Sequence, residues 1–163
     1  MWGDYQTKLG VKEDYNFPVK NDFVVLNLGT NDNGAFFQPP WKDSDGKEYV
    51  LHTDENKKAV FEDGKIITAG VVDFLKSIRS KNPAAKIIWT WGMIKLTAVP
   101  DYITAGVEQY KKETGDSEVY TLELDSMEDV EKLPEDKGSR GHPGPKTHYL
   151  AAKKLTAFIK QLI

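Results

Sequence analysis

The sequence predicts an α/β fold, a three-layer sandwich in which helices cover both faces of a parallel sheet. Two observations support this prediction: apolar runs of strand length alternate with amphipathic stretches of helix length, and a polar loop follows the first run. Three such strand and helix pairs follow one another along the chain. A sheet of this kind gathers its functional loops at the carboxyl ends of its strands.

The first pair begins with the unbroken apolar run FVVLNL at residues 23–28, which predicts a buried parallel strand. The run ends in Gly-Thr-Asn-Asp and leads into a polar, aromatic loop over residues 33–64. A helix is predicted next, and Asn82 and Pro83 should end it. The prediction rests on apolar residues at helical spacing, namely Ile67, Val71, Phe74, Leu75 and Ile78.

The second pair joins the strand KIIWTW, residues 86–91, to a helix that Gly115 should close. The third strand is VYTLEL, residues 119–124, and the final helix has Pro145 in its first turn. The second helix presents one apolar face: Ile103, Val107 and Tyr110. The final helix is expected to turn five apolar residues inward: Ala151, Leu155, Phe158, Ile159 and Leu162.

The composition is that of one compact domain. With 163 residues, 39% of them hydrophobic and 29% charged, we expect a single domain over residues 1–163, with the weakly patterned residues 1–20 as an extension. The formal net charge of -3 offers no basic surface to nucleic acid. No apolar run approaches membrane-spanning length, so we expect a soluble chain that makes no membrane contact. Its first residues have no signal-peptide pattern, and the compartment stays open.

Two polar motifs at predicted strand ends could carry chemistry. Asn31, in Gly-Thr-Asn-Asp after the first strand, can direct its amide NH2 into a cleft. His142, before the last helix, could act as a general base. Both should lie at the same edge of one parallel sheet, so we expect the two side chains to face a common cleft. The chain has no cysteine and no metal-binding spacing, so neither a metal nor another cofactor is expected.

The two motifs together resemble conserved blocks of the SGNH-type (GDSL-like) hydrolases. LGTND at residues 28–32 resembles the asparagine block, and GSRGHPGPKTHYLAAKKL at residues 138–155 resembles the histidine block with its closing helix. Between them, IIWTWGMI at residues 87–94 resembles a strand and turn of the family 2 carbohydrate esterases, which remove acetyl groups from plant polysaccharides. The resemblance covers roughly residues 17–163 and occurs in the order expected for the family.

The resemblance implies a flavodoxin-like SGNH-hydrolase sandwich of which the chain forms the C-terminal part. That fold has about five parallel strands where the sequence supplies three, so N-terminal strand and helix elements are missing. Asn31 would donate to the oxyanion of the tetrahedral intermediate, and Gly29 would shape its loop. His142 would take the proton of a serine nucleophile and return it to the leaving alcohol. The implied ligand is an acetylated carbohydrate.

The chain departs from the family pattern in two places. Ser139 stands where the family often has an acid, so we expect Nδ1 of His142 to bond Ser139 or a main-chain carbonyl and not a carboxylate. No Gly-Asp-Ser motif occurs, and the block with the second oxyanion glycine is also missing; the nearest string is Gly-Asp-Tyr at residues 3–5. No nucleophile is therefore assigned, and the isolated chain is expected to have negligible esterase activity. The remaining serines lack a strand-to-elbow context: Ser44, Ser77, Ser80, Ser117 and Ser126.

Four further side chains are candidates for a substrate pocket. Trp91 and Met93, at the end of the second strand, could line an acyl or sugar pocket or belong to the core. Trp41 and Phe37, in the long loop after Asn31, could stack on a sugar or pack on the loop itself.

Two functions from different classes remain open at this stage. The first is an O-acetyl esterase portion whose nucleophile lies elsewhere, and the second is a catalytically inactive carbohydrate-binding or interaction module. With only three strands, the run at residues 23–28 should have an open edge that needs a cover. The cover is expected to be a missing N-terminal half or a second copy of the chain, and less readily the first twenty residues folded back.

Overall fold

A computed structural model describes residues 20–128, 136 and 138–163 of the chain. The predicted extension at residues 1–20 therefore lies, but for its last residue, outside the described residues. Within the described part, no helix combines the length and the apolar character needed to cross a membrane. In chain order the elements are β1 (Phe23–Asn27), α2 (Thr30–Ala35), β2 (Trp41–Lys42), β3 (Glu48–Tyr49), α3 (Phe61–Lys81), β4 (Lys86–Trp91), α4 (Pro100–Thr114), β5 (Val119–Glu123), the 3-10 turn η1 (Ser139–Gly141) and α5 (Pro145–Leu162).

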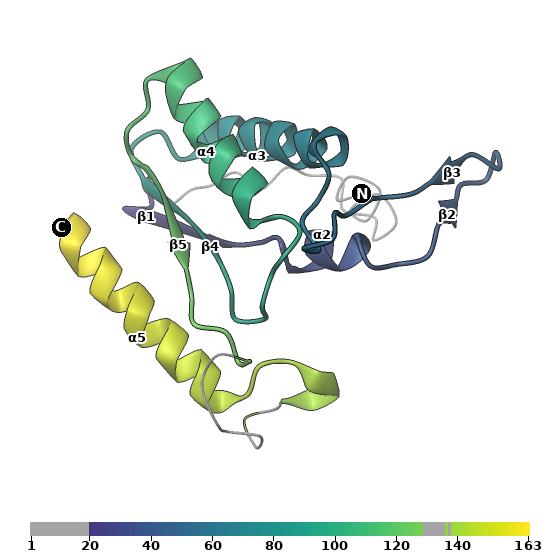
Figure 1. Cartoon of the computed structure of the whole chain (residues 1–163). Coiled ribbons are helices and arrows are strands. Elements are labelled where there is room, and N and C mark those ends of the chain that lie inside the picture. The colour runs from purple at the N-terminus through teal and green to yellow at the C-terminus, as the bar shows by residue number, and fades with distance from the viewer. Residues whose placement is uncertain (1–19, 129–135, 137) are drawn as a thin grey trace.

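The predicted parallel sheet is confirmed. Its strands lie in the order β1, β4, β5, and both neighbouring pairs are parallel (Figure 1). The register places Val25 opposite Ile88, and Ile88 opposite Tyr120. The chain passes from β1 to β4 through α3 and from β4 to β5 through α4, so all three strands end at the same edge of the sheet.

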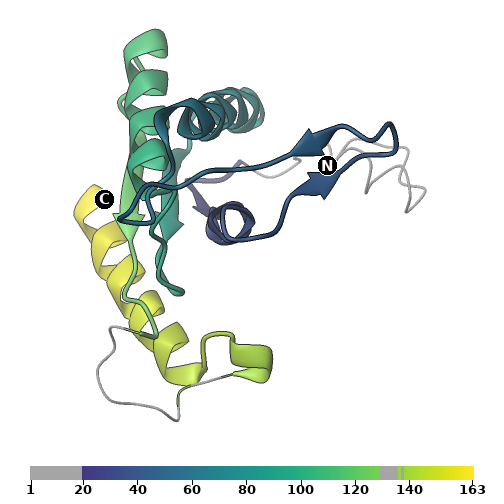
Figure 2. The same ribbon diagram turned by 45° about the vertical axis from the view of Figure 1, so that its right-hand side comes forward.

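Helices lie against both faces of this sheet (Figures 1 and 2). Alternate side chains of β4, among them Ile87 and Trp89, join the core that α3 and α4 cover. On the other face, the ring of Tyr120 in β5 packs edge-on against Phe158 of α5, with 6.1 Å between centroids. The main core cluster includes Leu26, Val71, Val72, Leu75, Ile87, Trp89, Ile103, Val107, Tyr110 and Val119.

The boundaries and packing of α3 and α4 follow from a few residues. α3 stops at Asn82, whose side-chain amide donates to the carbonyl of Ile78 over 3.0 Å, and Pro83 comes next. α4 ends at Gly115 in the left-handed conformation (φ 74°), as the sequence predicts. Gly106 lets α4 approach α3 closely, since a Cβ there would lie 2.6 Å from the Cβ of Val71.

The first strand is parallel, as predicted, but it is less buried than expected. Leu26 is the buried residue of β1, whereas Val25 is 41% exposed and Leu28, just after the strand, is also exposed. The reason is position, because β1 is the end strand of the described sheet and has β4 as its one described neighbour. The final helix is likewise less buried than expected: of its inward apolar set Ala151 alone is buried, and the other four are half-buried.

The long segment predicted as a loop contains a small hairpin. β2 and β3 pair antiparallel, with Trp41 opposite Tyr49. Asp43 builds the turn, since its Oδ1 accepts hydrogen bonds of 3.0 Å from the main-chain N–H groups of Asp45 and Lys47. The hairpin projects away from the sheet and its covering helices (Figure 2).

Candidate active site

The first candidate residue, Asn31, sits on the short helix α2 at the carboxyl end of β1. The turn into α2 requires Gly29, which has a positive φ of 120° and whose Cβ, if present, would lie 2.8 Å from Cδ1 of Ile103. The carbonyl of Gly29 accepts the first hydrogen bond of α2, from the N–H of Asn33 at 2.8 Å. Asn31 itself is exposed, and its side-chain amide has no hydrogen-bond partner among the described residues.

Asn33 is a positioning residue that the sequence analysis missed. Its side chain is buried, and its Oδ1 accepts two main-chain hydrogen bonds, from Thr97 at 2.9 Å and from Ala98 at 2.8 Å. These bonds connect α2, the helix that contains Asn31, to the loop after β4. The available signal was a second asparagine two residues after Asn31, but its partners lie 64 and 65 residues away in sequence.

His142, the second candidate, follows the turn η1 and is exposed. Its Nδ1 lies 3.0 Å from the main-chain carbonyl oxygen of Ser139, which is the kind of contact expected from the serine at that position. A carbonyl oxygen can only accept, so Nδ1 carries the hydrogen of the neutral imidazole and Nε2 keeps a free lone pair. The turn that permits this contact has Arg140 (φ 57°) and Gly141 (φ 77°) in the left-handed region.

The loop around His142 is fastened to the start of α5 by Asp136. The Asp136 carboxylate accepts hydrogen bonds from the hydroxyl of Thr147 (2.5 Å), from the N–H of Thr147 (2.7 Å) and from the N–H of Lys146 (2.8 Å). These bonds, that from the Thr147 hydroxyl foremost, hold the pKa of Asp136 below its ordinary value. The main chain closes the loop as well, through Gly144 N–H to the Asp136 carbonyl at 2.9 Å.

Asn31 and His142 lie at the same end of the sheet but on separate segments. Figure 1 shows α2 and η1 beyond the carboxyl ends of the strands, apart from one another. An apolar hollow of about 340 Å³ opens beside Asn31, and its lining includes the flanking residues Gly29 and Asp32. Neither Asn31 nor His142 belongs to that lining, so the described residues alone do not unite the two side chains in one cleft.

The four candidate pocket residues do not come together either. Trp91 is buried in the core with 6% of its surface exposed, and its Nε1 has no hydrogen-bond partner in the described part of the chain. The sulfur of Met93 accepts a hydrogen bond of 3.7 Å from Nδ2 of Asn27. Trp41 is 62% exposed on the projecting hairpin, and Phe37 is also exposed.

The hairpin gives Trp41 an aromatic partner that the sequence analysis did not identify. Its ring lies 5.3 Å from that of Tyr49, between centroids, at an interplanar angle of 38°. The ammonium of Lys47 sits 4.9 Å above the Tyr49 ring. Tyr49 in turn donates from its hydroxyl to Oδ2 of Asp43 at 3.0 Å, which steadies the exposed pair.

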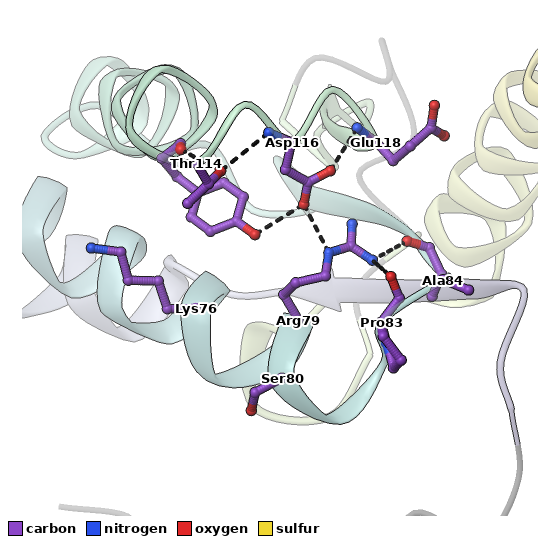
Figure 3. A pocket seen from close by; sticks show the side chains of 10 residues that line it. Lys76, Arg79, Ser80, Pro83, Ala84, Thr114, Asp116 and Glu118 are labelled. Atoms are coloured by element: carbon purple, nitrogen blue, oxygen red, sulfur yellow. Dashed lines mark hydrogen bonds and ion pairs between the residues drawn. The ribbon is translucent and has the colours of Figure 1, made fainter.

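A second hollow, of about 530 Å³, lies at the opposite end of the sheet, where β4 and β5 begin (Figure 3). Arg79 lies at its centre in a network of hydrogen bonds: its Nε donates to Asp116 at 2.8 Å, and its Nη1 donates to the carbonyl of Ala85 at 2.6 Å. Burial opposes the charged form of Asp116, but hydrogen bonds from Glu118 N–H, Arg79 and Tyr110 keep its pKa below the ordinary value. This hollow is remote from both candidate motifs.

In residues 20–128, 136 and 138–163, no group of three or more histidine and acidic side chains could hold a metal ion. Asn31 has a side-chain amide that can donate hydrogen bonds, and Nε2 of His142 can accept one when Nδ1 carries the hydrogen.

Comparison with known proteins gives matches among solved structures, whereas no protein-family model and no curated protein matches the chain. An acetyl xylan esterase (Est2A) from the rumen bacterium Butyrivibrio proteoclasticus is 35% identical, with a TM-score of 0.82 over 96% of this chain and 41% of that one. A family two carbohydrate esterase from Clostridium thermocellum, in complex with cellohexaose, is 26% identical, with a TM-score of 0.60 over 90% of this chain and 38% of that one.

A third structure supports the fold alone. The family two carbohydrate esterase from Cellvibrio japonicus is 18% identical, with a TM-score of 0.57 over 91% of this chain and 35% of that one. The chain thus spans 35% to 41% of the length of these three proteins. The first two structures confirm that the chain resembles the C-terminal part of an SGNH-type hydrolase close to the family 2 carbohydrate esterases.

Proposed function

We propose that the chain is the C-terminal portion of a carbohydrate O-acetyl esterase and carries its oxyanion donor, Asn31, and its general base, His142. In this proposal residues 1–163 belong to one partial domain, and the nucleophilic serine belongs to a part of the enzyme outside the chain. One observation carries the proposal: Nδ1 of His142 is engaged by the Ser139 carbonyl at 3.0 Å, which leaves Nε2 as a proton acceptor. The likeness to an acetyl xylan esterase supports the choice of substrate class.

The roles follow from the chemistry of acyl transfer. The serine oxygen attacks the acetyl carbonyl carbon while Nε2 of His142 takes the serine proton. The negative oxygen that forms is stabilised by the NH2 group of Asn31, held on the turn at Gly29. The intermediate collapses when His142 returns the proton to the departing sugar hydroxyl. Water then attacks the acetyl-serine with His142 again as base, and acetate is released.

The serines of the chain support a nucleophile supplied from elsewhere. Ser80 donates to the carbonyl of Ser77 within α3, at 2.7 Å, and Ser126 is buried against Glu128. Among the described residues no serine hydroxyl is hydrogen-bonded to His142. The part that brings the serine would be a missing N-terminal half of the domain.

Aromatic residues on the hairpin support a carbohydrate ligand. The exposed pair of Trp41 and Tyr49 offers flat apolar faces of the kind that stack on sugar rings, and Phe37 lies exposed earlier in the same segment. Trp91 has no open face for such a role in this chain, and Met93 is half-buried at the end of β4. Trp41, Tyr49 and Phe37 are therefore the stacking residues in this proposal.

The test is hydrolysis of p-nitrophenyl acetate and of acetylated xylan by the chain alone and in the presence of the complementary part of the enzyme. We expect negligible turnover by the chain alone and substantial turnover by the assembled protein, lost in the variants His142→Ala and Asn31→Ala. Turnover by the chain alone that disappears when one of its own serines is replaced contradicts the proposal.

The second candidate function is a catalytically inactive carbohydrate-binding module. The observation that favours it is the exposed Trp41 and Tyr49 pair, which can bind sugars without any catalytic group. Binding of acetylated xylan by the isolated chain, lost in Trp41→Ala and accompanied by no turnover after assembly, would select this function over the esterase.

A further inference from the structure

We propose that the outer edge of β1 and the apolar hollow beside it form a docking face for a parallel strand and an amphipathic helix, supplied by the part of an esterase domain that lies outside this chain. The identity of this occupant rests on the proposed function; the need for one rests on the geometry below. The docking face consists of the outer edge of β1 with Leu28, Ile66, Ile67, Gly70 and Phe74.

The edge of β1 presents unpaired main-chain groups. In the described residues β1 pairs with β4 alone, and Leu28 N–H still donates to the carbonyl of Thr90 at 3.3 Å. Main-chain groups alternate in direction along a strand, so the N–H groups of Val25 and Asn27 point away from β4. Natural proteins seldom leave such an apolar parallel edge open, because it pairs readily with another strand.

The hollow beside this edge has the character of an unfilled core. It holds about 340 Å³, and half of its lining residues belong to α3; Leu28 and Gly29, just after β1, line it as well, as does Trp89 of β4. Ile66 is 65% exposed there, and Phe74 is exposed on the next turns of the same helix face. Asp32 is the one charged residue of the lining, so an apolar helix face suits the hollow better than a sugar, whose hydroxyls would find few partners.

The face of the sheet that α5 covers is also partly exposed at β1. Val25, which points to the α5 side, is 41% exposed, and within α5 only Thr147 and Ala151 are buried. An open edge with uncovered surface on both faces is what remains when a strand and its flanking helix are absent. A ligand lodged in the hollow would cover one face and leave the edge unpaired.

The two end strands of the sheet differ in how α5 covers their faces. β5 is also an end strand, but α5 of the same chain lies beside it (Figure 1). Tyr120 packs against Phe158 at 6.1 Å, and Asp125 just beyond β5 is paired with Lys154 at 2.7 Å. On the same face of β1, Val25 stays 41% exposed.

The comparison structures favour an esterase segment as the occupant over a second copy of the chain. The acetyl xylan esterase that superimposes with a TM-score of 0.82 is covered by this chain over 41% of its length, so it has ample further sequence from which such a segment could come. Two copies joined by a twofold axis would bring hollow against hollow and leave both unfilled. One complementary strand with its helix fills the hollow and pairs the edge together.

The test is co-expression of the chain with the segment of the Butyrivibrio proteoclasticus esterase that the chain does not match, followed by light scattering of the purified product. We expect a one-to-one complex in which the amides of Val25 and Asn27 become protected from hydrogen exchange. Ile66→Lys should weaken the complex at least tenfold. Tyr149→Lys is the matched control, because Tyr149 is 66% exposed on α5, away from the docking face, and should leave binding unchanged.

The chain alone provides a second readout that needs no partner. We expect its Val25 and Asn27 amides to exchange at least tenfold faster than those of Val24 and Leu26. Slow exchange of these amides that is lost when residues 1–19 are removed would show that the chain covers its own edge and would overturn the proposal. A dimer of the chain that Ile66→Lys dissociates would overturn it in favour of a second copy.

The remaining outcomes separate this proposal from the proposed function. No complex, or a complex that Ile66→Lys leaves intact, refutes the docking face. A complex that forms and is disrupted by Ile66→Lys, but hydrolyses no acetyl ester, supports the docking face and contradicts the esterase function.

Discussion

Replacing Asn33 by alanine should destabilise the chain and release α2 from the loop after β4. The side-chain oxygen of Asn33 accepts hydrogen bonds from the main-chain N–H groups of Thr97 at 2.9 Å and Ala98 at 2.8 Å. Alanine removes the acceptor and leaves both donors without it. Ala98 is fully buried and Thr97 is half-buried, so water can replace the bond to Thr97 but not the bond to Ala98.

The magnitude follows from that difference in burial. A buried donor left without an acceptor costs about 1–3 kcal/mol, and we assign this cost to Ala98 alone. In a chain of this size each kcal/mol corresponds to about 2–4 °C in Tm, so a fall of several degrees is expected. Urea unfolding followed by circular dichroism measures the free energy of unfolding, and hydrogen exchange at the Ala98 amide shows whether the loss is local.

A matched asparagine provides the control. Asn56 is exposed, and its side chain has no hydrogen-bond partner among the described residues, so Asn56→Ala should change the free energy of unfolding by less than about 0.5 kcal/mol. Asn33→Asp keeps an oxygen at the accepting position and should fall between the wild type and Asn33→Ala. Equal effects of Asn33→Ala and Asn56→Ala, or an unchanged exchange rate at Ala98, would refute the assignment of Asn33 as the anchor of α2.

Three further outcomes are expected. Nitrogen-15 NMR of neutral His142 should find the hydrogen on Nδ1, and Ser139→Ala should not change this because the contact uses the main chain; the opposite tautomer would contradict the reading. The pKa of Asp136 is lowered on folding. Its hydrogen bonds to Lys146 and Thr147 should therefore contribute full stability at pH values above the pKa that Asp136 has in the unfolded chain, and this contribution should be lost as the pH falls through the lower pKa of the folded state. Hydrogen exchange of the first turn of α5 measures this, and Asp136→Ala should abolish the protection at neutral pH. Gly70→Ala should stabilise α3 by about 0.5–1 kcal/mol, since nothing lies within 4 Å of the added Cβ, whereas Gly106→Ala should destabilise the chain because its Cβ would meet Val71; thermal unfolding of both variants compares the signs.

The sheet was predictable because its strands are short, continuous apolar runs, a pattern typical of strands buried on both faces of a parallel sheet. The run at residues 86–91 is buried throughout its last five positions, as its pattern indicates. The run at residues 23–28 has the same apolar character and yet is fully buried only at Leu26, because burial of a parallel strand depends on a neighbour on each side. That neighbour is not encoded in the run itself. The hairpin was missed for a different reason, since its two-residue strands are too short to show alternation.

The candidate site was predictable where a contact is local and not where it is long-range. The bond from Nδ1 of His142 to a main-chain oxygen spans three residues, and Ser139 in place of an acid was sufficient to expect it. The role of Asn33 depends on a loop more than 60 residues away, which no local pattern indicates. The burial of Trp91 was open to prediction, because it alternates with Ile87 and Trp89 and so belongs to the same face of β4.

The position of Asn31 links the open edge to the proposed chemistry. Asn31 follows β1 after a tight turn at Gly29, so it lies at the carboxyl end of the strand whose outer edge is unpaired. A parallel strand docked on that edge would end beside the same turn, because the carboxyl ends of neighbouring parallel strands lie together at one end of the sheet. A loop leaving its carboxyl end could then bring a serine to Asn31 without any change in α2. The open edge of β1 and the turn that holds Asn31 are thus adjacent, so in the proposed function one polypeptide segment would both pair the edge and supply the serine.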